Sequence, residues 1–159
     1  MRQGSIMASA ALANVAALAC CPVQAVEAGI AAYSVAGDSI PQPLHGLTGN
    51  SEQGRRLVLD RETGNCLICH QVPLPREPSQ GDLGPSLAGV GSRLDAGQLR
   101  YRLVDQSKLN PATIMPPYHR VDGLARVAAR YRSKPVFSSQ EIEDVVAWLA
   151  TLKEQGSGR

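Results

Sequence analysis

Residues 66–70 are Cys66-Leu67-Ile68-Cys69-His70, and this pentapeptide decides how the rest of the 159-residue chain is interpreted. The two cysteines stand three positions apart, so one helical turn presents both thiols on the same side. The histidine follows directly and adds an imidazole at the same place. Three kinds of site use such a pattern: covalent haem attachment, a redox-active cysteine pair, and half of a zinc site.

Residues 1–25 have the features of a secretory signal peptide. Arg2 supplies the positive start, residues 6–19 are mostly Ala, Leu, Val and Ile, and Val23-Gln24-Ala25 is a small-residue cleavage site. The alternatives are an Ala-rich buried helix, or a lipoprotein signal with Cys20 or Cys21 lipidated. We expect cleavage and a periplasmic location. No apolar run of about 18 residues follows, so no membrane span is expected in the mature chain.

Removal of residues 1–25 would leave Cys66 and Cys69 as the two cysteines of the mature chain. The periplasm is oxidising, but a disulfide between residues so close in sequence would staple little of a domain. A thioredoxin-like pair needs a βαβ context and a zinc site needs further ligands, and the sequence offers neither. The pattern therefore favours covalent attachment of one haem through Cys66 and Cys69, with His70 as an iron ligand.

The composition fits this interpretation and excludes other classes. The formal net charge of +2 is too small for a typical nucleic-acid-binding protein, and 43% apolar residues argue against a disordered chain. Only six residues are aromatic, one Phe, one Trp and four Tyr, which is few for the core of a domain of this size. A haem at the centre of the domain would explain the shortage, because helices and loops would then line the macrocycle.

The second axial ligand of the iron is predicted by elimination. The soft donors left after signal removal are His45, His119 and Met115, with Lys108 and Lys134 as rarer ligands. Met115 precedes Pro116 and Pro117, which hold the backbone extended and favour a loop that presents one thioether. We therefore expect Met115 as the ligand, with His119 as the weaker candidate and a solvated His45. A lone methionine in a core is the alternative.

Such His/Met ligation has a functional consequence. A thioether ligand favours ferrous iron and raises the reduction potential, and a six-coordinate iron has no open position for a substrate. Both properties favour electron transfer over chemistry at the iron.

Four further residues are candidates for contacts around the haem. The Pro85 carbonyl is expected to accept a hydrogen bond from His70 Nδ1–H and so fix the ring, although Pro85 also fits a plain turn. Arg93, Arg100 and Arg102 are candidates for the haem propionates, and we expect only one of them to reach these groups.

Hydrophobic periodicity predicts a mainly α fold with long loops, without strands or internal repeats. One helix begins at Ser51 and ends near Gly64, and the prolines after it enforce a loop. A second begins at Asp95 with a pattern like a capping box, and apolar positions 124, 127, 128 and 131 predict a third. The last begins with the capping box of Ser138 and Glu141 and carries an apolar face through Leu149.

Three regions follow from these patterns. Residues 1–25 are the predicted signal peptide, and residues 26–50, rich in Gly, Pro and Ser, form an irregular leader. Residues 51–155 are the predicted folded domain.

With these parts in place, the chain resembles the class I cytochromes c over about residues 51–152. Members of that family cross their first and last helices where a glycine meets an aromatic residue, and Gly54 and Trp148 stand at suitable places. Within the class, the chain is similar to the SoxX family. The similar segments are 84–93, 98–100, 109–111 with Met115-Pro116, 123–128 and 131–135.

The SoxX resemblance implies a function in bacterial sulfur oxidation. SoxX is the monohaem subunit of SoxXA, an L-cysteine S-thiosulfotransferase that joins thiosulfate to a cysteine of the SoxY carrier and releases two electrons. The catalytic haem belongs to SoxA, and SoxX accepts the electrons. The resemblance thus implies a heterodimer with a SoxA-like haem subunit, transient contact with a SoxYZ-like carrier, and a soluble cytochrome as acceptor. It assigns no catalytic residue to this chain.

Three other functions stay open at the level of sequence. A free-standing electron carrier would use the same haem chemistry without a permanent partner. A redox sensor or ligand-binding cytochrome would have a displaceable Met115, and a structural domain would hold no haem.

A basic cluster stands outside the haem motifs. Its members are Arg120, Arg126, Arg130, Arg132 and Lys134, with Asp122 as the acid among them. Such a cluster either docks an acidic partner or forms a solvated helix face.

Overall fold

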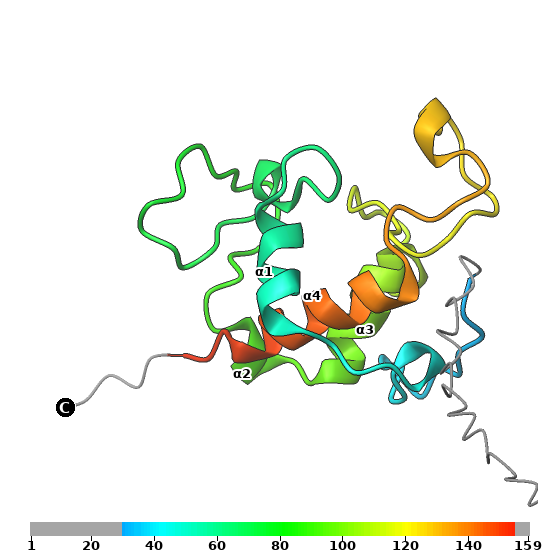
Figure 1. Ribbon diagram of the computed structural model, residues 1–159, viewed down its shortest axis with the longest axis horizontal. Coiled ribbons are helices and arrows are strands. Elements are labelled where there is room, and N and C mark those ends of the chain that lie inside the picture. Colours follow the sequence, from blue (N-terminus) through cyan, green and yellow to red (C-terminus); the bar gives the residue numbers. More distant parts are fainter. Residues whose placement is uncertain (1–29, 155–159) are drawn as a thin grey trace, which may run out of the picture.

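The computed structural model describes residues 30–154 and is mainly helical, as predicted (Figure 1). Its α-helices are α1 (Ser51–Leu59), α2 (Val90–Arg93), α3 (Ala96–Asp105) and α4 (Ser139–Thr151). Its 3₁₀ turns are η1 (Leu44–Gly46), η2 (Cys66–Ile68), η3 (Gln106–Lys108) and η4 (Ala129–Tyr131). Within residues 30–154 no strand forms, and Ala36 and Ser39 make an isolated antiparallel bridge.

Helix α1 crosses α4 at a point of close backbone contact (Figure 1). A Cβ atom on Gly54 would collide with the carbonyl oxygen of Asp144, so only glycine allows this approach. The sequence correctly placed Gly54 at the crossing, but its nearest neighbours are backbone atoms of Asp144 and Val145. Trp148 lies one turn further along α4 and is buried.

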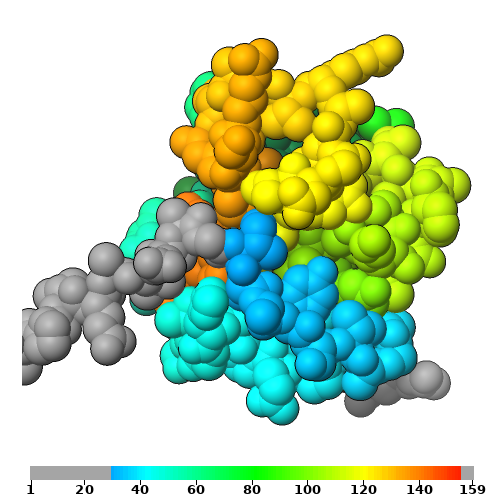
Figure 2. Space-filling model, turned by 90° about the vertical axis from the view of Figure 1, so that its right-hand side faces the viewer, coloured from blue at the N-terminus to red at the C-terminus, as the bar shows by residue number. Residues whose placement is uncertain are grey.

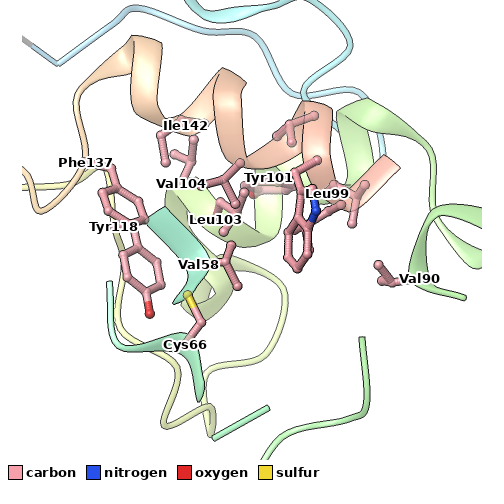
Figure 3. Close-up of a cluster of buried hydrophobic side chains, with 14 of the residues drawn as sticks. Val58, Cys66, Val90, Leu99, Tyr101, Leu103, Val104, Tyr118, Phe137 and Ile142 are labelled. Carbon is pink, nitrogen blue, oxygen red and sulfur yellow. The ribbon is translucent and has the colours of Figure 1, made fainter. Parts of the chain in front are cut away.

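The starts of α3 and α4 are confirmed as predicted. Asp95 and Gln98 form a complete capping box on α3, and Ser138 and Glu141 form one on α4. The apolar side chains that follow these caps are buried and make up much of the core (Figure 3). They are Leu99 and Leu103 on α3, and Ile142, Val145, Val146 and Leu149 on α4.

The described part of the leader packs onto α3 and α4, where Ala31, Ile40 and Leu44 are buried. A buried ion pair holds it there. Arg100 donates from Nε and Nη2 to the Glu143 carboxylate at 2.7 and 2.8 Å, and from Nη1 to the Ile40 carbonyl at 2.6 Å. The Leu44 amide donates to the same carboxylate at 2.9 Å. The pair is thus fully hydrogen-bonded, which a buried charge requires.

Two helix predictions were wrong. Residues 124–131 form turns and the short η4 instead of an α-helix. Gly123, Arg126 and Ser133 have positive φ values of 65°, 58° and 61°, and a right-handed helix cannot pass through such residues. The first helix ends at Leu59 and not near Gly64, because the backbone adopts an extended conformation at Asp60.

The predicted signal peptide, including Cys20 and Cys21, lies outside the described residues. Among residues 30–154, no helix combines the length and the hydropathy that a membrane crossing demands.

Candidate functional site

The cysteine–histidine pentapeptide forms one tight turn. Residues Cys66–Ile68 are the 3₁₀ turn η2, and the amides of Cys69 and His70 both donate to the Cys66 carbonyl, at 3.1 and 2.9 Å. Asn65 enters the turn in the left-handed conformation, with φ 49°. Cys66 is buried, Cys69 is half-buried, and no disulfide joins them. The turn therefore brings two thiols and one imidazole together.

The ring of His70 is held by the segment that follows the motif. Its Nδ1 lies 2.8 Å from the Pro85 carbonyl oxygen, which fixes a tautomer with Nδ1–H as donor and Nε2 as an available lone pair. The Gly84 amide donates to the Cys69 carbonyl at 2.8 Å. A Cβ atom on Gly84 would collide with the imidazole, so glycine is needed for this contact.

These groups line one cavity of ≈ 920 Å³, together with Met115. Its walls are the inner faces of α1, α3 and α4, with Val58, Leu99, Leu103, Val145 and Leu149 among the apolar side chains. Figure 3 shows Val58, Leu103 and Cys66 within the same cluster of buried side chains. Apolar walls, two thiols, one imidazole and one thioether around a cavity of this size fit a haem, whose macrocycle is large, flat and apolar.

Met115 lies on a loop that is anchored at its far end. Its amide donates to Thr113 Oγ1 at 3.1 Å, and its side chain is half-buried. The Tyr118 amide donates to the Leu103 carbonyl at 3.0 Å, and the Tyr118 hydroxyl donates to the Gly64 carbonyl at 2.9 Å. The loop that carries the thioether is thereby tied to the residues that precede Cys66.

The other candidate iron ligands do not line the cavity. His119 is buried, and its Nδ1 lies 2.8 Å from the Phe137 carbonyl while its Nε2 accepts from the Ala31 amide at 3.2 Å. Burial lowers the pKa of His119 below its usual value. Both nitrogens are thus occupied by backbone groups. The remaining candidate ligands have exposed side chains; they are His45, Lys108 and Lys134.

The three candidate arginines divide by orientation. Arg93 and Arg102 line the cavity, and both also bond backbone carbonyls, of Ala88 at 2.6 Å and of Gln98 at 2.9 Å. Arg100 does not line it, because the buried pair with Glu143 points it towards the leader. Arg100 is therefore wrong as a propionate candidate.

Two residues of the site, Gly81 and Tyr118, were not predicted from the sequence. Gly81 donates its amide to the Leu67 carbonyl at 2.8 Å, and a Cβ atom there would collide with the Ile68 carbonyl. Tyr118 lines the cavity and stacks on Phe137, with ring centroids 5.0 Å apart. Burial raises the pKa of Tyr118 and raises that of the neighbouring Cys66 thiol to about 11. The sequence signals that could have identified them were a glycine that follows the cysteine–histidine pentapeptide and a tyrosine that follows Met115-Pro116-Pro117.

The mouth of the cavity is apolar and exposed. Ile68, Leu83 and Ile114 line the cavity and yet are 59%, 70% and 74% exposed. They come from three different segments of the chain. We call these three side chains the apolar rim, because they are apolar, exposed and line the same cavity.

Among residues 30–154, no group of three or more His, Cys, Asp or Glu side chains is placed to hold a metal ion.

Comparison with solved structures identifies a protein that resembles this chain. No family model and no curated protein matches the chain. The chain is similar to one in a solved structure, described as the crystal structure of SoxXA from P. pantotrophus. The TM-score is 0.70 and the sequence identity 35%, over 77% of this chain and 95% of that chain. The predicted family and fold are thereby confirmed.

Proposed function

Because the chain belongs to the SoxX family of class I cytochromes c, we propose that it is an exported electron-transfer subunit of a thiosulfate-oxidising SoxXA-type enzyme. It would accept electrons from a SoxA-like haem subunit and pass them to a soluble cytochrome. The observation that carries the proposal is the apolar cavity lined by Cys66, Cys69, His70 and Met115.

These four residues would hold one haem c. Cys66 and Cys69 would bind it covalently, and His70 and Met115 would be the axial iron ligands. When bound, the haem supplies a one-electron couple between ferric and ferrous iron. The Pro85 carbonyl accepts from His70 Nδ1–H and so orients Nε2 towards the cavity. The apolar side chains that line the cavity would limit the access of water to the haem.

The same residues support electron transfer over sulfur chemistry on this chain. Cys66 and Cys69 are the two cysteines beyond residue 25, so haem attachment would leave no thiol for thiosulfate transfer. The anchored loop would keep the Met115 thioether available to fill the last iron position. The bond between sulfur atoms would therefore form on the partner subunit.

The apolar rim is the surface that we assign to the SoxA-like subunit. Electron transfer needs the two haems close together, and the rim residues line the cavity that would hold the haem of this chain. Burial of the rim side chains against the partner would add hydrophobic stabilisation.

Purification from the native periplasm tests the proposal. We expect a covalent haem, seen as peroxidase staining after denaturing electrophoresis, and co-purification with a second haem protein. The variant C66A/C69A should lose the stain. A haem-stained chain that elutes as a monomer, separately from the second haem protein, would favour the free-standing carrier. An unstained chain would contradict both the SoxXA subunit and the free-standing carrier.

A further inference from the structure

The segment 120–134, which we call the basic arm, is not used by the proposed haem site. It carries five cations and one acid, Asp122. Figures 1 and 2 show that this part of the chain rises from the body of the molecule as a projection without α-helix. Its shape is set by the left-handed residues Gly123, Arg126 and Ser133. The cations therefore stand on a protruding loop and not on a helix face.

Two of the five cations have partners that fix the arm to the body. Arg120 forms an ion pair with the buried Asp105 at 2.6 Å. Arg130 donates to the Glu62 carbonyl at 2.9 Å, and its guanidinium lies 5.1 Å from the Tyr131 ring centroid. These contacts give the arm a defined position, and Tyr131 is among the residues that line the cavity.

The other three cations have no such role. Arg126, Arg132 and Lys134 are exposed, and their side chains make no hydrogen bond or ion pair with any residue between 30 and 154. Three unpaired like charges on one short loop repel each other, and an opposite charge on a partner would relieve this repulsion.

We propose that the basic arm docks the acidic surface of a partner protein, with Arg126, Arg132 and Lys134 as its contacts. The proposal goes beyond the electron-transfer function, because it depends on surface charge and not on haem chemistry. Because the net charge of the whole chain is only +2, attraction of an acidic partner would come mainly from the positive charges of the arm. Anionic membranes are bound by larger cationic clusters, of about four to eight Lys or Arg, than these three free side chains. A matching acidic patch on a protein is the better fit.

A labelled peptide of about ten glutamates is the probe for this surface, and its binding to the purified haem protein is measured by fluorescence anisotropy. We expect binding at about 20 mM NaCl that weakens at about 200 mM, because salt screens exposed charges. The variant R126Q/R132Q should lose about fivefold in affinity. The matched control R55Q/R76Q removes two exposed arginines outside the arm and should change affinity less than about twofold.

Several results would overturn the proposal. One is equal loss of affinity in both double variants, which would indicate an effect of net charge alone. Another is no binding by the wild-type protein, or equal binding of a glutamine peptide. Binding to vesicles containing phosphatidylglycerol without binding to the glutamate peptide would assign the arm to membranes instead. Haem staining of each variant keeps these outcomes separate from a failure of the proposed function.

Discussion

Two histidines, His70 and His119, stand in similar local geometry and have different roles. Each places Nδ1 2.8 Å from a backbone carbonyl, of Pro85 and of Phe137. Their Nε2 atoms differ. His70 lines the cavity, whereas His119 Nε2 accepts from the Ala31 amide and lies near Ser139 Oγ at 3.4 Å.

The difference shows that the surroundings of Nε2 decide what a histidine does. A fixed Nδ1–H leaves a lone pair on Nε2 in both cases. At His70 this lone pair is available to a metal, and at His119 it completes the hydrogen bonding of a buried backbone. One side chain would belong to the haem site and the other to the attachment of the leader.

The largest expected difference between the two sites is in haem retention. The variant H70A should lose an iron ligand, so the yield of correctly ligated haem protein should fall by at least about tenfold. The variant H119Q should retain the haem, because His119 does not line the cavity. Absorption spectra and haem staining of both variants from periplasmic extracts measure the contrast. Equal haem content in the two variants would contradict the assignment of His70.

Substitution of Gly84 tests how His70 is held. In G84A the new methyl group would collide with the imidazole, and we expect a loss of about 1–3 kcal/mol in unfolding free energy together with a changed haem spectrum. The control G37A has open space around the new Cβ but a φ of 61°, and should cost about 1–2 kcal/mol. Only G84A should alter the spectrum. An unchanged spectrum would mean that Gly84 does not position the ring.

The pH dependence of stability tests His119. Its pKa in the folded protein is lowered, so the unfolded chain binds a proton first as the pH falls below about 6.5. The stability contributed by the neutral imidazole is present above that pH and is lost as the pH falls towards the folded pKa. Guanidinium unfolding followed by circular dichroism should show this decline.

The variant H119Q provides the control for that decline. Its unfolding free energy at pH 7 should be lower by about 1–3 kcal/mol, since buried hydrogen bonds are lost. Between pH 7 and 5 its unfolding free energy should change less than that of the wild type. An identical pH profile in wild type and H119Q would remove His119 as the cause.

The smallest effect is expected at the third histidine. His45 is exposed and does not line the cavity. The variant H45A should therefore keep the haem spectrum and change stability by less than about 0.5 kcal/mol. A larger change in the spectrum would mean that the leader reaches the site.

Features encoded by neighbouring residues were predictable from the sequence. The capping boxes of α3 and α4, the cysteine turn and the proximity of Pro85 to His70 all depend on short stretches of chain. The class of fold followed from the cysteine motif and the apolar faces of the helices, together with the family resemblance. Met115 was singled out by a count of the possible donors together with the two prolines that follow it.

Features that depend on distant contacts were not predictable in this way. Ala31 and His119 are separated by 88 residues, and Arg100 and Glu143 by 43. No local pattern indicates such pairs, so Arg100 stood among the three candidates for the haem propionates, whereas its side chain bonds Glu143 and the leader. The helix predicted at residues 124–131 failed because apolar spacing carries no information on positive φ angles such as that of Arg126.

The most direct test of the account is the weak charge-transfer band of ferric haem near the red edge of the visible spectrum, which reports an iron–thioether bond. We predict this band in the wild-type protein and in H119Q, and its loss in M115A. A band that persists in M115A, or that disappears in H119Q while M115A retains it, would contradict the assignment of His70 and Met115 as the axial pair.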